Sequence, residues 1–300
     1  MKLYFSFFLF IIYCLPVNSQ ILEGFVFDST NQKKLPFVNI SLKNVNEGTY
    51  TDENGYYKLD LKNIKIIDTL IISFIGFEKK AINLNKYKDE RVYNLNIALS
   101  PKKEELNEVI ISSKEIEYEL FSNNVGTNRK GSFISSVPFG YEVCLFINND
   151  KNKKAKLNEL KLNLKKREYT NIDIFETYYR ISFYKKNPVN NYPGDLISYE
   201  NIIIKPENKN GKIEVNLSNK NIFLPRDGIF IGIETINPNK KLPENNMYLT
   251  SPNLLYTHSK EKMTYRRYRG KEWKKENKKS VFKKGYFAVP YLNLKVNYFK

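Results

Sequence analysis

The chain of 300 residues contains two cysteines and one histidine, and its formal net charge is +17. A single histidine excludes a hydrolase zinc site built on two histidines and a glutamate, and two cysteines exclude a disulfide framework. Residues 251–300 hold 14 basic and 3 acidic side chains, so the positive charge is concentrated at the C-terminal end.

The first residues have the pattern of a secretory signal peptide. Lys2 precedes an apolar run at residues 4–15, and residues 17–19 supply the small residue that cleavage requires. We predict a signal peptide at residues 1–19 and a mature chain that begins at Gln20. The protein is therefore expected to be exported, and to be periplasmic, associated with the outer membrane, or secreted.

Two alternatives for this segment involve a membrane. A spanning helix needs roughly 20 apolar residues, and Pro16 with Asn18 stops the run short of that. Lipidation would use Cys14, but the bulky Tyr13 precedes it where a small residue is expected. Lipidation at Cys14 is thus the minor alternative, and no transmembrane segment is expected after signal cleavage.

Cleavage would leave Cys144 as the only cysteine of the mature chain. It lies in the apolar run at residues 141–147, where a buried, inert thiol is the expected role. An exported protein without disulfides must be stabilised by its hydrophobic cores.

Short strands separated by turns begin at residue 21 and predict a small β-sandwich. Asn54-Gly55 predicts a hairpin turn, because glycine adopts positive φ at low cost. The nearly continuous apolar run at residues 68–77 predicts a strand buried on both faces. The expected strands are at residues 25–27, 36–42, 49–59 (as a hairpin), 68–77 and 92–99.

Four ordered blocks of this region resemble the carboxypeptidase-regulatory-like domain. The blocks are residues 24–28 (GFVFD), 35–40 (LPFVNI), 48–57 (GTYTDENGYY) and 72–77 (ISFIGF). The resemblance implies a transthyretin-like β-sandwich at residues 20–100, of a kind common in exported proteins of Bacteroidetes. It implies an accessory module and carries no implication of peptidase activity.

Residues 101–130 are polar and charged, and we predict a linker there. Within it, residues 106–111 (LNEVII) resemble the segment that follows this domain in TonB-dependent outer-membrane receptors. The residues that remain are too few for a receptor barrel, so the resemblance to a transporter ends there.

Strand patterns return from residue 131 and predict a larger, antiparallel, jelly-roll-like β-sandwich at residues 131–300. Alternation of leucine with polar residues at 160–165 indicates a half-buried strand. Strands are expected at residues 141–147, 160–164, 172–184, 202–204, 211–217, 229–233 and 286–296. The order of residues 180–184 (RISFY), 193–197 (PGDLI), 214–217 (EVNL) and 229–234 (IFIGIE) is similar to a C-terminal β-sandwich of uncharacterised Bacteroidetes proteins.

Catalytic signals are weak in this sequence. No nucleophile motif accompanies His258, which lies in a polar stretch and is expected at the surface. No local cluster of carboxylates marks a glycoside hydrolase, although paired carboxylates can be brought together by a fold. We therefore expect no catalytic residues, no metal and no cofactor, with a glycan-active hydrolase as the alternative.

The strongest local feature mixes aromatic and basic side chains between residues 265 and 275. Planar arginines can clamp carboxylates or phosphates, and aromatic rings can stack on a sugar. The candidate ligand-binding residues are Tyr265, Arg266, Arg267, Tyr268, Arg269 and Trp273. The competing and favoured interpretation is a hairpin whose aromatic side chains pack inward and whose cations are solvated.

These observations predict a non-catalytic accessory or binding protein of the cell envelope. Its expected partners are an envelope glycan, lipopolysaccharide or an outer-membrane protein, and a purely structural envelope component is a further alternative. Export argues against a nucleic-acid partner, since none is expected outside the cytoplasm.

Overall fold

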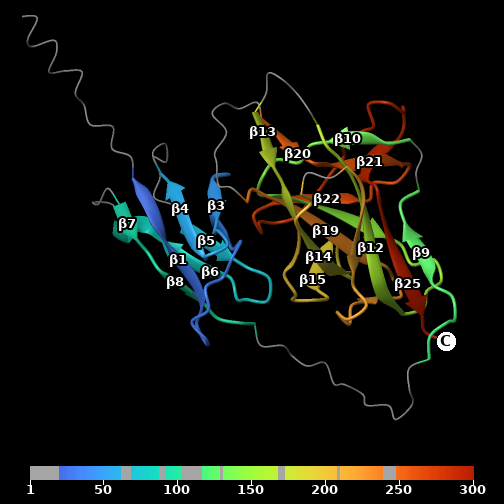
Figure 1. The fold of residues 1–300 in the computed structure, drawn as a ribbon, viewed down its shortest axis with the longest axis horizontal. Coiled ribbons are helices and arrows are strands. Elements are labelled where there is room, and N and C mark those ends of the chain that lie inside the picture. The colour runs from blue at the N-terminus through green and yellow to red at the C-terminus, as the bar shows by residue number, and fades with distance from the viewer. Residues whose placement is uncertain are drawn as a thin grey trace, which may run out of the picture.

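The computed structural model describes residues 20–61, 69–87, 92–102, 117–128, 131–167, 173–207, 210–238 and 248–300. The predicted signal peptide and residues 103–116 of the predicted linker lie outside these ranges. Figure 1 shows two modules made of strands, the first in blue to teal and the second in green to red. Helix within the described ranges is limited to one 3-10 turn, Leu84–Tyr87, so the all-β class is confirmed. No helix of these ranges is long and apolar enough to cross a bilayer.

The first module is a sandwich of two four-stranded sheets. Alternate residues of its first strand are buried, as expected for a strand with one face in a core. The buried side chains between the sheets include Leu22, Val26, Ile40, Tyr57 and Ile72. One sheet has the order β4 (Tyr56–Asp60), β1 (Ile21–Asp28), β7 (Val92–Asn94), with β8 (Ile97–Leu99) also paired to β1. The other has the order β3 (Gly48–Tyr50), β2 (Asn39–Leu42), β5 (Thr69–Ser73), β6 (Lys80–Asn83).

The predicted hairpin at residues 49–59 is wrong in its pairing. Its two strands, β3 and β4, pair with β2 and β1 and so belong to opposite sheets. The turn itself forms, with Gly55 at φ 74° and the Asp52 carboxylate accepting the amide hydrogens of Asn54 and Tyr56. Thr51 explains the crossing, because its hydroxyl donates to Leu35 O and accepts from the Val38 amide in the core.

The second module consists mainly of an eight-stranded and a seven-stranded sheet. The first has the order β10 (Phe133–Ser135), β21 (Asn253–Ser259), β12 (Ala155–Lys165), β25 (Leu292–Tyr298), β9 (Asn123–Gly126). Further pairs add β17 (Gly211–Asn216) and β18 (Phe223–Leu224) to β12, and β24 (Phe287–Pro290) to β21. The second has the order β15 (Pro193–Leu196), β14 (Tyr178–Lys186), β19 (Ile229–Ile236), β11 (Tyr141–Ile147), β22 (Thr264–Tyr268), β23 (Lys274–Lys275), with β16 (Ile202–Ile204) on β14.

One large apolar core fills the space between these two sheets, which confirms the second sandwich. It joins Leu160 and Leu162 of β12 with Ile181 of β14 and Ile231 of β19. Side chains of this kind stabilise the fold by about 1.5–3 kcal/mol each when fully buried.

Three predicted boundaries of strands and linker need correction. β9 pairs with β25, so residues 123–126 extend a sheet of the second module instead of belonging to a linker. The long strand expected at residues 172–184 is divided at Thr177 into β13 (Asp173–Glu176) and β14, and β13 pairs in parallel with β20 (Tyr248–Ser251). Finally, β5 is fully buried on one face only, since Leu70 and Ile72 are buried whereas Thr69, Ile71 and Ser73 are partly exposed.

Candidate functional site between the two modules

The seven-stranded sheet has an outer face that carries charges in the middle of apolar strands. Strand alternation sends Val143 and Leu145 of β11 into the core and leaves Glu142 and Cys144 on the outer face. The register then aligns one charged residue from each of four adjacent strands, β14, β19, β11 and β22. We call these residues the charged row: Arg180, Glu234, Glu142 and Arg267.

Each carboxylate of the charged row is paired with the arginine beside it. Arg180 Nη1 lies 2.7 Å from Glu234 Oε2, and Arg267 Nε donates to Glu142 Oε2 at 2.7 Å. Tyr184 OH donates to the other oxygen of Glu142 at 2.7 Å. Arg180, Glu142 and Glu234 are only 2–4% exposed, so the pairs replace the water that these charges have lost.

A glycine makes room for one of these carboxylates. A Cβ added at Gly232 would lie 2.1 Å from Glu142 Oε1, a distance that no side chain tolerates. Gly232 is the β19 partner of Cys144, one row along the sheet from Glu142. The absence of a side chain there lets the Glu142 carboxylate lie back over the sheet toward Tyr184.

The first module completes the coordination of the charged row. Asn39 of β2 donates from Nδ2 to Glu234 Oε1 at 2.8 Å, and Arg180 Nη2 donates to the carbonyl of Phe37. Tyr50 OH donates to the carbonyl of Thr235 at 3.1 Å. An apolar cluster of Phe37, Tyr50 and Ile236, flanked by Tyr178 and Ile203, seals this contact. The two modules are thus joined through buried polar groups.

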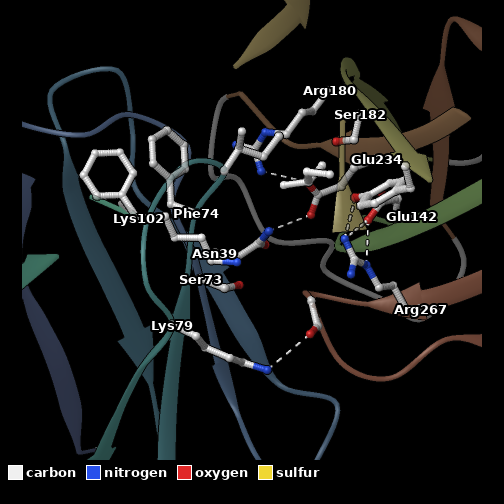
Figure 2. Close-up of a pocket in the computed structure, with 15 residues that line it drawn as sticks. Asn39, Ser73, Phe74, Lys79, Lys102, Glu142, Arg180, Ser182, Glu234 and Arg267 are labelled. Atoms are coloured by element: carbon white, nitrogen blue, oxygen red, sulfur yellow. Dashed lines mark hydrogen bonds and ion pairs between the residues drawn. The ribbon is translucent and has the colours of Figure 1, made fainter. Parts of the chain in front are cut away.

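A cavity of about 170 Å³ lies beside this contact and is lined by both modules. Figure 2 shows Lys79 and Lys102 of the first module on one side and the charged row on the other. Four cationic side chains and two carboxylates line it, which leaves two positive charges in excess. Lys79 Nζ makes one hydrogen bond of 3.3 Å, to the carbonyl of Gly270. We call this space the inter-module cavity.

Burial and neighbouring charges shift several pKa values around the cavity. Burial raises the pKa of Glu142, the charge of Arg267 opposes that rise, and the charge of Glu234 adds to it. Burial by itself would lower the pKa of Arg267, but Glu142 and Tyr184 raise it. Burial and Arg267 together lower the pKa of Lys79. Arg267 therefore stays charged, and the pKa of Glu142 lies above that of an ordinary carboxyl.

The six candidate residues of the basic segment do not form one exposed surface. Tyr265 and Trp273 pack in an aromatic cluster with Tyr184 and Phe230 on the outer face of the sheet. Trp273 lies 4.1 Å from the Arg267 guanidinium, ring centroid to Cζ. Of the six candidates, Arg267 lines the inter-module cavity. Trp273 contacts Arg267 and so lies next to a residue of the cavity wall.

Of the other three candidates, Arg269 lies at the module contact, and Arg266 lies on the opposite face of β22, where it pairs with Glu276. Arg269 is 6% exposed, donates to the carbonyl of Thr49 at 2.7 Å and lies over the Tyr50 ring. Its backbone φ of 40° is unusual for a residue with a side chain. Arg266 lies over Tyr141, whose ring also packs against Tyr268. The expectation of solvated cations is therefore wrong for Arg267 and Arg269, which are used within the protein.

Two further predictions concern isolated reactive side chains. Cys144 is fully buried, as predicted, and burial raises the pKa of its thiol well above the usual value. His258 is 8% exposed, stacks on Phe133 and hydrogen-bonds through Nδ1 to Ser280 Oγ at 2.8 Å. The expected surface position of His258 is thus wrong. Among the described residues, no three His, Cys, Asp or Glu side chains gather as a metal site requires.

The charged row was missed by the sequence interpretation, although a signal for it exists. Glu142, Arg180 and Glu234 each stand inside a strand that is otherwise apolar. A charge placed there must meet a partner of opposite sign or suffer a large desolvation cost. Two acidic and two basic strand residues of this kind predict mutual pairs, but only the register shows which pairs form.

Fold and site define a two-module β-sandwich protein whose modules meet over buried ion pairs. Residues 22–111 match the family model described as CarboxypepD_reg-like domain, so the first module is a carboxypeptidase-regulatory-like domain, as its sequence blocks predicted. None of the curated proteins matches the chain. Among solved structures it is similar to a DUF3823 family protein from Bacteroides uniformis, with 9% sequence identity and a TM-score of 0.23, over 90% of this chain and 95% of that chain.

Proposed function

We propose that this protein is an exported, non-catalytic binding protein of the cell envelope, and that its inter-module cavity receives an acidic group of an envelope glycan. The observation that carries the proposal is the excess of positive charge in the cavity. The arginines of the charged row are neutralised by their carboxylates, which leaves the amines of Lys79 and Lys102 to attract an anion. Hydrogen bonds from charged donors to a carboxylate or phosphate are among the stronger ones available to a protein.

The same geometry argues against hydrolysis by the two glutamates. A general acid or nucleophile must be able to exchange a proton or form a bond at its carboxylate. Glu234 accepts from Arg180 and Asn39, and Glu142 accepts from Arg267 and Tyr184. Both carboxylates are thus engaged in buried pairs, and Glu234 also joins the second module to Asn39 of the first.

Fluorescence of the single tryptophan tests the proposal. Trp273 contacts Arg267, which lines the cavity, so an anion bound there should change its emission. We expect glucuronate to alter the emission in a saturable manner that weakens with salt, and glucose to have no effect. Replacing both lysines, Lys79→Gln with Lys102→Gln, should weaken glucuronate binding about a hundredfold, since each lost charged hydrogen bond contributes about tenfold or more.

The matched control is Lys58→Gln, which removes an exposed lysine of β4 in the other sheet of the first module. Equal responses to glucuronate and glucose would contradict the proposal, and so would an equal loss in the Lys58 variant. Release of reducing sugar from an acidic oligosaccharide, abolished by Glu142→Gln, would establish the hydrolase alternative instead.

A further inference from the structure

The loop that connects β23 to β24 exposes two adjacent apolar side chains at its tip. Val281 is 85% and Phe282 is 73% exposed. The lysines nearest in sequence, Lys279, Lys283 and Lys284, are exposed as well. Single apolar residues are common on protein surfaces, but an aliphatic and an aromatic side chain together at a loop tip, surrounded by cations, need an explanation. We call residues 279–285 the basic tip.

The basic tip is held by a rigid base. The loop closes through backbone hydrogen bonds of 2.8 Å from Ser280 N to Tyr286 O and from Ala288 N to Lys278 O. Within the turn, Ser280 Oγ accepts the amide hydrogens of Phe282 and Lys283 at 3.2 and 3.1 Å. The two apolar side chains are therefore presented by an ordered turn.

Two rings of the second module, His258 and Phe133, support that turn. His258 of β21 hydrogen-bonds to Ser280 Oγ and stacks on Phe133, with ring centroids 5.3 Å apart. Phe133 in turn lies 5.3 Å from the Phe282 ring, centroid to centroid. The one histidine of the chain, which the cavity does not use, thus connects the core of the second module to the tip.

We propose that the basic tip docks this protein on an anionic phospholipid bilayer, with Val281 and Phe282 inserted at the boundary between headgroups and acyl chains. Apolar side chains gain by leaving water at this boundary, and lysines around them are attracted to anionic headgroups. The charge of the region matches such a surface, since residues 251–300 hold 14 basic and 3 acidic side chains. The small convex tip suits a deformable bilayer better than a preformed concave partner. None of its residues lines the inter-module cavity, so the two proposals are independent.

Co-sedimentation of the full mature chain with vesicles tests the docking. We expect binding to vesicles of phosphatidylcholine and phosphatidylglycerol, and little binding to phosphatidylcholine alone. The double variant Val281→Ser, Phe282→Ser should lose about tenfold or more in affinity, because it removes both apolar anchors. The triple variant Lys279→Gln, Lys283→Gln, Lys284→Gln should lose a factor of about five for each lysine.

Control variants elsewhere in the chain distinguish a specific effect of the basic tip from a general effect of net charge or of exposed apolar surface. Val189→Ser removes a valine that is 89% exposed in the turn between β14 and β15. Lys33→Gln, Lys43→Gln, Lys58→Gln removes three exposed lysines of the first module and changes the net charge equally. Both controls should bind like the wild type. Equal losses in tip and control variants, or equal binding to neutral vesicles, would overturn the proposal.

A spectroscopic variant covers the case in which the tip substitutions impair folding. Phe282→Trp in a Trp273→Phe background places the single tryptophan at the tip. We expect a blue shift of its emission with anionic vesicles, because the indole enters a less polar medium. An unchanged spectrum at saturating lipid would also overturn insertion of the tip, whatever the other variants do.

Discussion

Two stretches of the C-terminal fifty residues have similar composition and opposite environments. In β22 and the turn after it, Arg267 is half-buried, Arg269 is buried, and both are paired within the protein. In the basic tip, Lys279, Lys283 and Lys284 remain exposed around an apolar pair. Both stretches contribute to the same positive charge of the sequence, and only one of them is available to a partner at the surface.

The difference lies in what faces each cation across the fold. Arg267 is aligned with Glu142 by the pairing of β22 with β11, and Arg269 meets carbonyl and ring groups of β3 in the first module. The lysines of the tip lie in the loop between β23 and β24, outside both strands, and they are exposed. Charge density in sequence therefore indicates a binding surface only where the fold leaves the charges unpaired.

The strongest test of the buried half of this comparison removes a carboxylate of the charged row. Glu234→Ala leaves Arg180, 2% exposed, without its counter-charge. Loss of one partner of a buried pair costs about 3–5 kcal/mol, so we expect the free energy of unfolding to fall by that amount. Urea unfolding followed by circular dichroism measures the change.

Glu214→Ala is the matched control for that variant. Glu214 pairs with Lys212 and Lys161 on the exposed side of β17, where water screens the charges. We expect the urea midpoint of Glu214→Ala to stay close to that of the wild type. If both glutamate variants lower the free energy of unfolding equally, the charged row is solvated, and the buried polar contact between the modules is wrong.

Much of the fold could be predicted from the sequence, because strand patterns are local. Residues 141–147 and 229–233 were expected as strands and form most of β11 and β19. The crossing at Thr51 was not predictable, since a turn signal such as Asn54-Gly55 does not say which sheet each flanking strand joins. The charged row depended on a register between strands up to 125 residues apart, as for Arg267 and Glu142, and register is a property of the folded sheets.

A second, smaller effect is expected at Arg269, where a guanidinium and a strained backbone coincide. Arg269→Ala removes the hydrogen bond to Thr49 O, and bonds from charged donors contribute about 1.5–3 kcal/mol. Arg269→Gly removes the same bond but relieves the positive φ, which should recover about 1 kcal/mol. Urea unfolding of the two variants in parallel would show this order. Equal stabilities would mean that residue 269 adopts an ordinary backbone conformation in solution.

The smallest expected effect is a dependence of stability on pH. Arg267 is paired with the buried carboxyl of Glu142, whereas the lysines of the tip are exposed, so only the first stretch should make stability depend on a buried carboxyl. Burial raises the pKa of Glu142 above its usual value of 4.5. Between 4.5 and the raised pKa, the folded protein holds a proton that the unfolded chain has released, so the contribution of Glu142 to stability falls as pH increases. The amide that Glu142→Gln introduces cannot titrate, so that variant lacks this dependence.

We therefore expect the stability of the wild type relative to Glu142→Gln to fall as pH rises from about 4 to about 8. Urea midpoints of both proteins across this range measure the difference. A wild type that gains stability relative to the variant as pH rises would mean that the charge of Arg267 outweighs burial and holds the Glu142 pKa below 4.5. Glu142 would then be a full anion at neutral pH, and the cavity would carry no more than its excess of two positive charges.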